Sequence, residues 1–595
     1  MNSKLISKVD VKRAIKIHGL PGNILSSLLF SALGFNRINK KYERFSGYTG
    51  REFTTALLKE FKVGYDLINK ELDYIPQEGP FIIISNHPYG AIDGVILINI
   101  FSAARPDVKF LTNFMLSQIP NLKDFFSPVN PFSNRKDLTR SFSGLRMASE
   151  TLKNGGCLGL FPAGEVATTY GTSIIQDKEW QQTIIKLIKN SGVPVLPVYV
   201  HGTNSNFFHW LGKIHPVLRT ARLPGELLNK SGKIVPVRIG KLISPNEMSE
   251  YKDLKELGDF LRSRTYALEA NVKKAIIHPE EVYSVPIALA KNRRTLLKEI
   301  NSLSKDKLLF TTGHFSCYLS ESKDIPFLMH ELGRKREEAF RAVGEGTKKA
   351  LDTDEYDEYY KHLILWDKQR SRVAGAYRLG YGKDILAKKG IKGFYTKTLF
   401  DYEPEYFDYL KQSIELGRSF ISVEYQKEAL PLMLLIKGLL YSVLNDSDIR
   451  YLIGPVSISS WYPKFYRSLI IKYLTDNHSI KGMDKMARPK NPFFPDFLRS
   501  NPESLIDGKT DTIEKFDRYL LRLSDNEFRL PTLLKKYLKI NAKIINYNVD
   551  PDFNYCVDGL VFMDLTKVPK QEIMTLARDE KNKKAIMKRF GFDEG

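Results

Sequence analysis

A histidine and an aspartate with the residue types of an acid–base pair lie in the stretch SNHPYGAIDG, residues 85–94. His87 follows the apolar run FIIIS almost directly, and Asp93 comes six positions after it. An aspartate that binds one imidazole nitrogen fixes the tautomer, and the other nitrogen can then take the proton of a hydroxyl nucleophile. His87 and Asp93 are therefore predicted to be catalytic, with a substrate alcohol in the role that serine has in serine hydrolases.

Two further motifs follow in order, FPAGEVA (161–167) and VPVLPVYVHG (193–202). Together the three motifs resemble the glycerolipid and lysophospholipid acyltransferases, whose blocks are a histidine and an aspartate four residues apart, an FPEGTRS-like turn and a VPxxPV strand. The resemblance covers roughly residues 50–250, and the stretch PVNPFSNRK (128–136) occupies the place of a further block. It implies substrate contacts from Asn86, Arg135, Gly164 and Glu165.

Two departures from this pattern change the expected acceptor. Five residues instead of four separate the histidine from the aspartate, and Ala163, Glu165 and Val166 stand where the family has Glu, Thr and Arg. The missing arginine makes a phosphate-bearing acceptor less favoured. The variant resembles the branch that acylates lyso-ornithine lipids and related aminolipids. Glu165 would then pair with a cationic amine, or else serve as a carboxylate that stabilises the turn.

A second set of charged residues lies between residues 325 and 460. The phrases HELGRKREEAFRAVGEGT (330–347) and ELGRSFISVEYQ (415–426) resemble the acyl-homoserine-lactone synthases. They resemble still more closely the ornithine lipid synthases, which N-acylate an amino acid with a 3-hydroxyacyl group and share the GNAT fold. The resemblance implies a substrate site containing the following residues: Arg336, Glu345, Asp354, Asp357, Arg378, Glu415 and Arg418.

The N-acylation chemistry assigns roles within this second set. An amine must be neutral when it attacks a thioester, so a carboxylate has to take its proton. Glu415 is the leading candidate for this base, and Asp357 is the next. Arg378 and Arg418 either form an ion-pair scaffold or touch the substrate. The Gly-rich pantetheine loop of many GNAT enzymes is absent, because QKEALPLML follows SFISVEY, and this favours a carrier-bound acyl donor over acetyl-CoA.

The elements that must position these residues form two α/β domains. Strand-like runs at 81–85, 108–113, 156–164 and 193–202 alternate with helix-like stretches such as 139–155, and 235–243 resembles a last strand. This alternation predicts an acyltransferase-type domain with a mostly parallel central sheet. The pattern restarts near residue 301 with a hairpin at 307–320 and strands at 362–368, 372–382 and 419–425, which predicts a GNAT-like α/β domain.

The predicted organisation has five parts. They are a helical segment at 1–50 that associates with membranes, an acyltransferase-like domain at 51–250, a helical connector at 251–300, a GNAT-like domain at 301–570 and a charged tail at 571–595. The apolar stretch 20–35 has basic flanks and either lies in a membrane interface or packs on the core. It is too short and too rich in Gly, Pro, Ser and Asn to span a bilayer.

The amino-acid composition narrows the range of expected binding partners. The net charge of +22 favours acidic carrier protein and an anionic inner-membrane surface, and no compact basic block indicates nucleic-acid binding. A lineage rich in lysine would give the same charge. The three dispersed cysteines favour neither a disulfide framework nor a zinc site, and no signal peptide is recognised. We therefore expect a cytoplasmic protein peripherally bound to the inner membrane, without cofactor or metal, that uses acyl carrier protein or coenzyme A thioesters.

The two halves together predict a bifunctional aminolipid synthase. The C-terminal domain would N-acylate ornithine or a similar amino acid, and the N-terminal domain would O-acylate the new hydroxyl of the lyso-lipid. One alternative is a 1-acylglycerol-3-phosphate acyltransferase with an accessory GNAT-like domain. Another is a basic membrane-binding protein whose acyltransferase folds are inactive.

Overall fold

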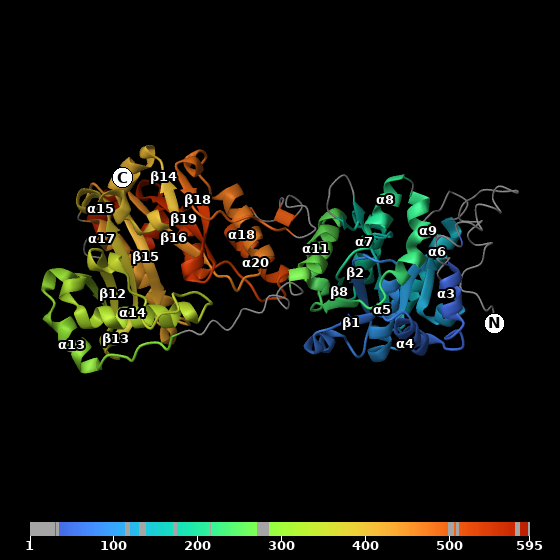
Figure 1. Cartoon of the computed structure of the whole chain (residues 1–595). Coiled ribbons are helices and arrows are strands. Elements are labelled where there is room, and N and C mark those ends of the chain that lie inside the picture. Colours follow the sequence, from blue (N-terminus) through green and yellow to red (C-terminus); the bar gives the residue numbers. More distant parts are fainter. Residues whose placement is uncertain are drawn as a thin grey trace. The chain divides into compact units, whose positions relative to one another are not determined.

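The computed structural model describes residues 30, 35–113, 119–129, 138–169, 175–214, 216–270, 285–444, 446–497, 505–506, 511–576 and 583–592 (Figure 1). The chain divides into two compact units. The first comprises Met1–His278, Phe497–Asp507 and Arg522–Asn526, and the second comprises Pro279–Asp496, Gly508–Leu521 and Glu527–Gly595.

The first unit contains a seven-stranded sheet in the order β1-β9-β8-β2-β5-β3-β4. The strands are β1 (Gly64–Asp66), β2 (Phe81–Ser85), β3 (Lys109–Asn113), β4 (Phe126–Val129), β5 (Cys157–Leu160), β8 (Val195–Val200) and β9 (Ile234–Ile239). All neighbours pair in parallel except β8 and β9, which are antiparallel. The predicted α/β domain with a mostly parallel sheet is confirmed. A short antiparallel pair, β6 (Thr168–Thr169) and β7 (Ile175–Gln176), follows the FPAGEVA turn.

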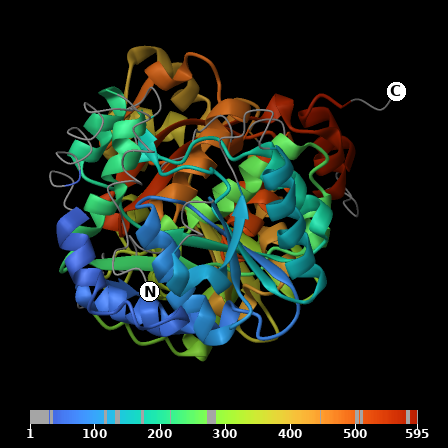
Figure 2. The same ribbon diagram turned by 90° about the vertical axis from the view of Figure 1, so that its right-hand side faces the viewer.

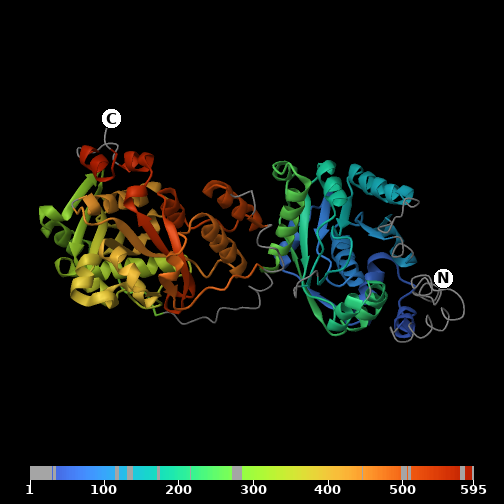
Figure 3. The ribbon, with the colours of Figure 1, turned by 90° about the horizontal axis from the view of Figure 1, so that it is seen from above.

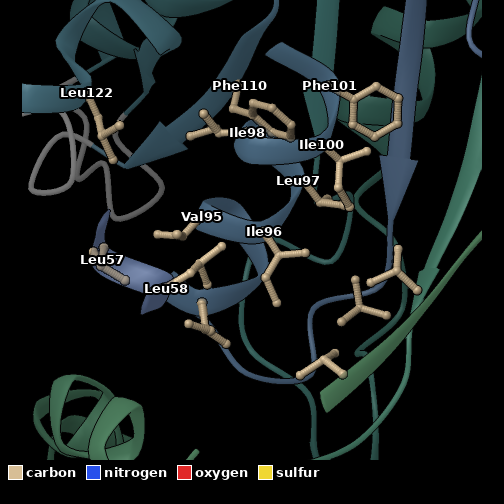
Figure 4. Packing of buried hydrophobic residues seen from close by; sticks show 14 of the residues in the cluster. Leu57, Leu58, Val95, Ile96, Leu97, Ile98, Ile100, Phe101, Phe110 and Leu122 are labelled. Carbon is tan, nitrogen blue, oxygen red and sulfur yellow. The ribbon is translucent and has the colours of Figure 1, made fainter. Parts of the chain in front are cut away.

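Helices surround this sheet (Figure 2 and Figure 3). They are α3 (Phe35–Tyr42), α4 (Gly50–Glu60), α5 (Ala91–Ala104), α6 (Leu138–Lys153), α7 (Gln182–Ser191), α8 (Asn206–Ile214), α9 (Pro216–Leu228), α10 (Pro245–Ser249) and α11 (Leu254–Ala267). Every residue of β2 is buried, as expected for a central strand covered on both faces. Figure 4 shows Leu57 and Leu58 of α4 near Val95 and Ile96 of α5 in the core. The strand that carries the candidate base is thus held rigidly.

The second unit contains an eight-stranded sheet in the order β10-β11-β12-β13-β15-β16-β19-β18. The strands are β10 (Leu308–Thr312), β11 (Phe315–Glu321), β12 (Lys361–Asp367), β13 (Arg372–Tyr381), β15 (Ser413–Ile421), β16 (Tyr451–Ile458), β18 (Lys543–Asp550) and β19 (Cys556–Asp564). β15 and β16 are parallel, and the other neighbours are antiparallel. The β15–β16 pairing covers only Ser413–Glu415 against Tyr451–Ile453. Beyond these residues the two strands are not paired, which matches the splayed strands expected of a GNAT-like sheet.

The main helices of the C-terminal half are α13 (Arg293–Ser302), α14 (Pro326–Arg341), α15 (Gly382–Lys389), α16 (Phe407–Lys411), α17 (Ala429–Leu444), α18 (Lys464–Asn477), α20 (Ile513–Leu523), α21 (Thr532–Lys539), α22 (Lys570–Leu576) and α23 (Lys583–Arg589). A two-stranded sheet of β14 (Phe400–Tyr402) and β17 (Ala487–Pro489) completes this half. The hairpin predicted at 307–320 is present as β10 and β11.

Three segments differ from the sequence expectation. The region 251–300 is no single connector, because α11 packs on α7 and β8 in the first unit, whereas Leu296 and Ile300 of α13 belong to a core cluster of the second. The strand expected at 419–425 ends at Ile421 and a 3-10 turn follows. Part of the tail at 571–595 is packed, since the Arg589 guanidinium donates to the Val443 carbonyl oxygen at 3.3 Å. Such packing partners lie too far away in the sequence to be read from a local pattern.

The predicted membrane segment 20–35 lies almost entirely outside the described residues. Within the residues that the structure describes, every helix is too short or too polar to cross a bilayer.

Candidate active sites

His87 and Asp93 lie in the turn that joins the end of β2 to the start of α5. The Nδ1 atom of His87 is 3.0 Å from Oδ2 of Asp93. This distance agrees with the expectation that the longer turn still joins the carboxylate to the ring. Asp93 is fully buried, while the His87 side chain is 18% exposed. His87 follows the carboxyl end of a central parallel strand, which is where α/β domains commonly bind their ligands.

The five-residue spacing follows from a second task of Asp93. Its Oδ2 accepts hydrogen bonds from the backbone N–H groups of Tyr89 and Gly90, both at 2.9 Å. Asp93 is thereby part of the N-terminal cap of α5, where a carboxylate is favoured by the helix dipole. Gly90 has φ +94°, a conformation that favours glycine. One carboxylate thus starts the helix and faces the imidazole ring.

Two residues outside the recognised pair fix the position of His87. The Phe161 ring stacks on the imidazole with 4.1 Å between centroids. The carboxylate of Asp177 accepts the backbone N–H of His87 at 3.1 Å and the Trp180 indole N–H at 3.4 Å. Burial raises the pKa of Asp177, against the lowering effects of Arg262 and of the hydrogen bond from His87. No motif pointed to Asp177, which lies 90 residues from the histidine in the chain.

The FPAGEVA turn brings charge to the same site. Gly164 has φ +72°, and a Cβ atom there would lie 1.9 Å from the Gln181 side-chain nitrogen, so the turn requires glycine. The Glu165 carboxylate is 2.9 Å from the Arg219 guanidinium and 3.2 Å from the Lys178 ammonium. Both cations come from segments outside the three motifs. Glu165 therefore already has cationic partners within the protein.

Two residues predicted to contact the substrate at the first site remain, Asn86 and Arg135. The Asn86 side chain is buried, donates to the Val200 carbonyl at 2.8 Å and accepts the Val200 N–H at 2.7 Å. This gives Asn86 the role of joining the ends of β2 and β8, and its substrate contact stays a prediction. Arg135 lies outside the described residues.

The structure joins the predicted charged residues of the second unit in one buried ion-pair network. The Arg336 guanidinium is 2.8 Å from Asp357, which is also 3.3 Å from Arg378. Arg378 also pairs with Asp354. Burial by itself would raise the pKa of Asp357, but Arg336 and Arg378 hold that pKa well below its usual range. Asp357 is therefore a poor proton acceptor at neutral pH, and it is the carboxylate that Arg336 and Arg378 share.

Glu415 is enclosed by donors. Its two carboxylate oxygens accept hydrogen bonds from the backbone N–H groups of Tyr395 (3.0 Å) and Thr396 (2.8 Å) and from the hydroxyls of Tyr360 and Thr396. Burial raises the pKa of Glu415, and the hydrogen bonds from Thr396 and Tyr360 oppose that rise. This geometry does not favour the prediction that Glu415 is the base, because it holds the 395–396 segment instead of facing a substrate.

Arg418 marks the point where β15 leaves its regular pairing. Its φ of +48° lies in the left-handed region, and the β13–β15 register shifts beside it between Ala376 and Arg378. Such a bulge bends a strand and redirects a side chain. The Arg418 guanidinium binds Asp352 at 3.0 Å and lies over the Tyr395 ring, 4.9 Å from its centroid. The ion-pair scaffold expected of Arg418 is thus present.

Asp550 and Asp558 lie within electrostatic range of Arg418, and Glu345 lies within range of Asp558. Asp558 accepts the Ser457 hydroxyl at 2.7 Å, and burial together with Asp550 raises its pKa to about 7. Burial and the charge of Asp558 raise the pKa of Glu345 to about 8. The Glu345 side chain is half-buried, and no hydrogen bond to its carboxylate is found among the described residues. Glu345 is thus an available carboxylate whose pKa suits a general base near neutral pH.

The loop that carries Glu345 is fixed beside the end of β16. The Ser459 hydroxyl donates to the Val343 carbonyl at 2.6 Å, and the Asn554 amide donates to the Gly344 carbonyl at 2.8 Å. Gly344 has φ +77°, and a Cβ atom there would lie 2.3 Å from the Trp461 ring. The sequence patterns pointed to Glu345 but missed Asp550 and Asp558, since an aspartate in a strand carries no local signature.

Comparisons with known proteins agree with the presence of two different acyltransferase regions in the chain. Residues 10–275 match a family described as "Acyltransferase", and residues 336–436 match a family described as "Acetyltransferase (GNAT) domain". A glycine N(alpha)-acyltransferase of Phocaeicola vulgatus is 34% identical over 267 residues, which cover 42% of this chain and 74% of that protein. The chain belongs to the acyltransferases. It combines an O-acyltransferase domain with a GNAT N-acyltransferase domain.

Two further comparisons concern this acyltransferase. A lyso-glycine lipid O-acyltransferase of Phocaeicola vulgatus is 27% identical over 206 residues, 33% of this chain and 72% of that protein. The solved 1-acyl-sn-glycerophosphate acyltransferase of Thermotoga maritima aligns with a TM-score of 0.26 and 17% identity over 43% of this chain and 91% of that one, a likeness that carries no argument. Among the described residues of the acyltransferase, no group of His, Cys, Asp and Glu side chains could hold a metal ion.

Proposed function

We propose that this acyltransferase makes an acylated amino-acid lipid in two steps, one in each domain. The observation that carries the proposal is the presence of two separate acid–base sites of different chemistry in one chain: His87 with Asp93, and Glu345 beside the splayed strands. The relatives named for glycine N-acylation and for lyso-glycine lipid O-acylation support the same pair of reactions.

The first step is assigned to the GNAT domain. The amino nitrogen of an amino acid attacks the thioester carbon of a 3-hydroxyacyl group, the carbon–sulfur bond breaks, and the thiol of the carrier leaves. Glu345 takes the proton of the attacking amine. The negative charge of Asp558 raises the affinity of this carboxylate for the proton. A protein of net charge +22 suits an acidic acyl carrier protein as donor and an anionic inner-membrane surface as its working place.

The second step is assigned to the N-terminal domain. The 3-hydroxyl of the lyso-lipid attacks the carbonyl carbon of a second acyl thioester, and the ring nitrogen Nε2 of His87 takes the hydroxyl proton. The carbon–sulfur bond then breaks, and the imidazolium returns the proton to the leaving thiolate. The Asp93 carboxylate holds the tautomer and stabilises the imidazolium. Asp177 and Phe161 keep the ring in place without touching the reacting atoms.

Glycine is the proposed acceptor amino acid, because two relatives that this chain matches over 74% of their length are named for glycine N-acylation. Ornithine is the second candidate, since its additional amine would be matched by the negative charges of Asp550, Asp558 and Glu345. A lysophosphatidic acid acceptor has one observation in its favour: Arg219 and Lys178 bring cations to the turn that lacks the motif arginine. Glu165 pairs with both cations, so this acceptor ranks below a lyso-aminolipid.

The proposal is tested by expressing the full chain in a bacterial host without aminolipids and analysing the extracted lipids by mass spectrometry. We expect a new diacylated glycine lipid and its monoacyl precursor. If the new lipid is a diacylated ornithine lipid, the acceptor amino acid is ornithine instead of glycine, and the two-step scheme still holds. An unchanged aminolipid profile together with increased phosphatidic acid would establish the lysophosphatidic acid alternative and reject the proposal.

A further inference from the structure

Helix α8 carries an aromatic pair that faces solvent. Phe208 and His209 bury one face of the helix, while Phe207 is 51% and Trp210 55% exposed on the other. The Phe207 and Trp210 rings stack with 5.8 Å between centroids. A helix on the surface of a globular domain normally turns polar side chains toward water, so two adjacent exposed aromatic rings require a partner.

Helix α9 packs beside α8 and adds positive charge around this pair (Figure 1). The Arg222 guanidinium lies 5.5 Å from the centre of the Phe207 ring. The ion pairs found among the described residues at the α8–α9 hairpin, residues 206–228, join four cations to two carboxylates, namely Lys178, Arg219, Arg222 and Lys230 to Glu165 and Glu226. Cations therefore exceed carboxylates at the hairpin, and an anionic partner is favoured.

The hairpin also contacts the turns of the O-acyltransferase site directly. A Cβ atom on Gly90 would lie 2.9 Å from the Leu223 side chain, so α9 packs against the turn that holds His87. Arg219 of the same helix binds Glu165 of the FPAGEVA turn at 2.9 Å. Whatever docks on the hairpin therefore lies close to the entrance of this site.

We propose that the α8–α9 hairpin docks on an anionic lipid bilayer, with Phe207 and Trp210 inserted at the level of the headgroups. Tryptophan and phenylalanine are the side chains that favour this interface, and neighbouring arginines attract anionic headgroups. A second copy of the chain is a poorer occupant, because a symmetric dimer would bring the same cationic patch against itself. The choice of a bilayer rests on the proposed function in one respect: a lipid acceptor has to be collected from a membrane.

The test is co-sedimentation of the full chain with vesicles of phosphatidylcholine alone or with added phosphatidylglycerol. We expect binding that increases with phosphatidylglycerol, and a loss of at least about tenfold in the partition constant for the double variant Phe207→Ala/Trp210→Ala. The matched control is Phe327→Ala/Phe494→Ala, which removes two aromatic rings that are 48% and 71% exposed in the other unit and should bind as wild type does.

Tryptophan fluorescence shows whether Trp210 contacts the bilayer, independently of how much the double variant lowers the partition constant. Vesicles that contain a doxyl-labelled lipid should quench the wild type, and Trp210→Phe should bind equally well but lose most of that quenching. Double-variant binding within twofold of wild type, or quenching unchanged in Trp210→Phe, would overturn the proposal. The proposal would also be overturned if, without vesicles, the wild type formed an oligomer and the double variant did not, since the patch would then be a protein interface. Vesicle binding requires neither of the two acyl-transfer reactions. The binding result can therefore be distinguished from a failure of the proposed function.

Discussion

The two candidate sites solve the same problem, removing a proton from an acceptor, with opposite surroundings. His87 stands at the end of a parallel strand with one carboxylate partner and an exposed edge. Burial, together with the charge of one carboxylate, Asp558, raises the pKa of Glu345 to about 8. A hydroxyl acceptor needs a base while the bond forms, whereas an amine has to lose a proton that it holds firmly at neutral pH. In the proposed scheme, acceptor chemistry therefore sets the base: imidazole for the alcohol and a carboxylate of raised pKa for the amine.

The largest expected effect separates the two reactions. His87→Ala should lower O-acylation by about 10³-fold, because it removes the general base, and leave N-acylation unchanged. Mass spectrometry of the lipids should show the monoacyl aminolipid accumulating. His201→Ala, which changes a histidine just beyond the end of the neighbouring strand β8, is the control and should retain both activities. If His87→Ala retained full O-acylation activity, His87 would not be the general base.

The second effect concerns the amine site and its pH dependence. Burial and Asp558 raise the pKa of Glu345 to about 8, so its base form increases as the pH rises through about 8. We expect kcat/KM for N-acylation to rise over that range. Glu345→Gln should lower it by about 10²-fold and flatten this part of the profile. Glu355→Gln alters an exposed carboxylate of the same unit and should preserve the wild-type profile, and a profile that survives Glu345→Gln would assign the base to another group.

The third effect distinguishes a base from a positioning residue. Glu415→Gln keeps one acceptor oxygen but turns an NH₂ group toward donors, which should cost about 2 kcal/mol of unfolding free energy. We expect a lower Tm in thermal denaturation and less than about a tenfold loss in kcat at temperatures where the variant is folded. Gln412→Glu, at an exposed position near the start of the same strand, should leave Tm nearly unchanged. An unchanged Tm combined with abolished N-acylation would restore Glu415 as the catalytic base.

The smallest expected effect concerns acceptor binding at the first site. Glu165→Gln removes the carboxylate that pairs with Arg219 and Lys178 and so frees two cations. The KM for an anionic lyso-lipid should fall a few-fold, whereas kcat should change little because Glu165 is not bonded to His87. Glu150→Gln, a change at an exposed carboxylate of α6, is the control. A higher KM for Glu165→Gln would mean that Glu165 itself binds a cationic acceptor, as the motif comparison predicted.

The sequence was informative where function depends on neighbouring residues. His87, Asp93 and Gly164 lie in short motifs whose turn geometry is local, so type and spacing were sufficient to predict them. Asp177 and Arg219 reach the same site from far along the chain and were not predicted. The same limit explains Glu415: its position in a phrase was recognised, but its enclosure by Tyr360 and Thr396 follows from the fold alone.

The alternation of strands and helices also predicted the two α/β domains and the hairpin and central strands at 307–320, 362–368 and 372–382, since a buried strand needs a continuous apolar run, but it did not predict β16, β18 and β19. The end of β15 at Ile421 and the division of 251–300 between two units depend on packing partners that no local pattern reveals.

The left-handed backbone at Arg418 limits how this enzyme can be altered. Most side chains are strained at φ +48°, and glycine is the residue that adopts this conformation freely. Arg418→Gly would therefore keep the bend of the strand and delete only the guanidinium, while Arg418→Leu would delete the charge and retain the strain. The pair of variants would divide the contribution of position 418 into backbone shape and charge, two properties that a single arginine now supplies together. For an engineer who seeks new acceptors, glycine at this position is the mildest way to remove positive charge from the amine site.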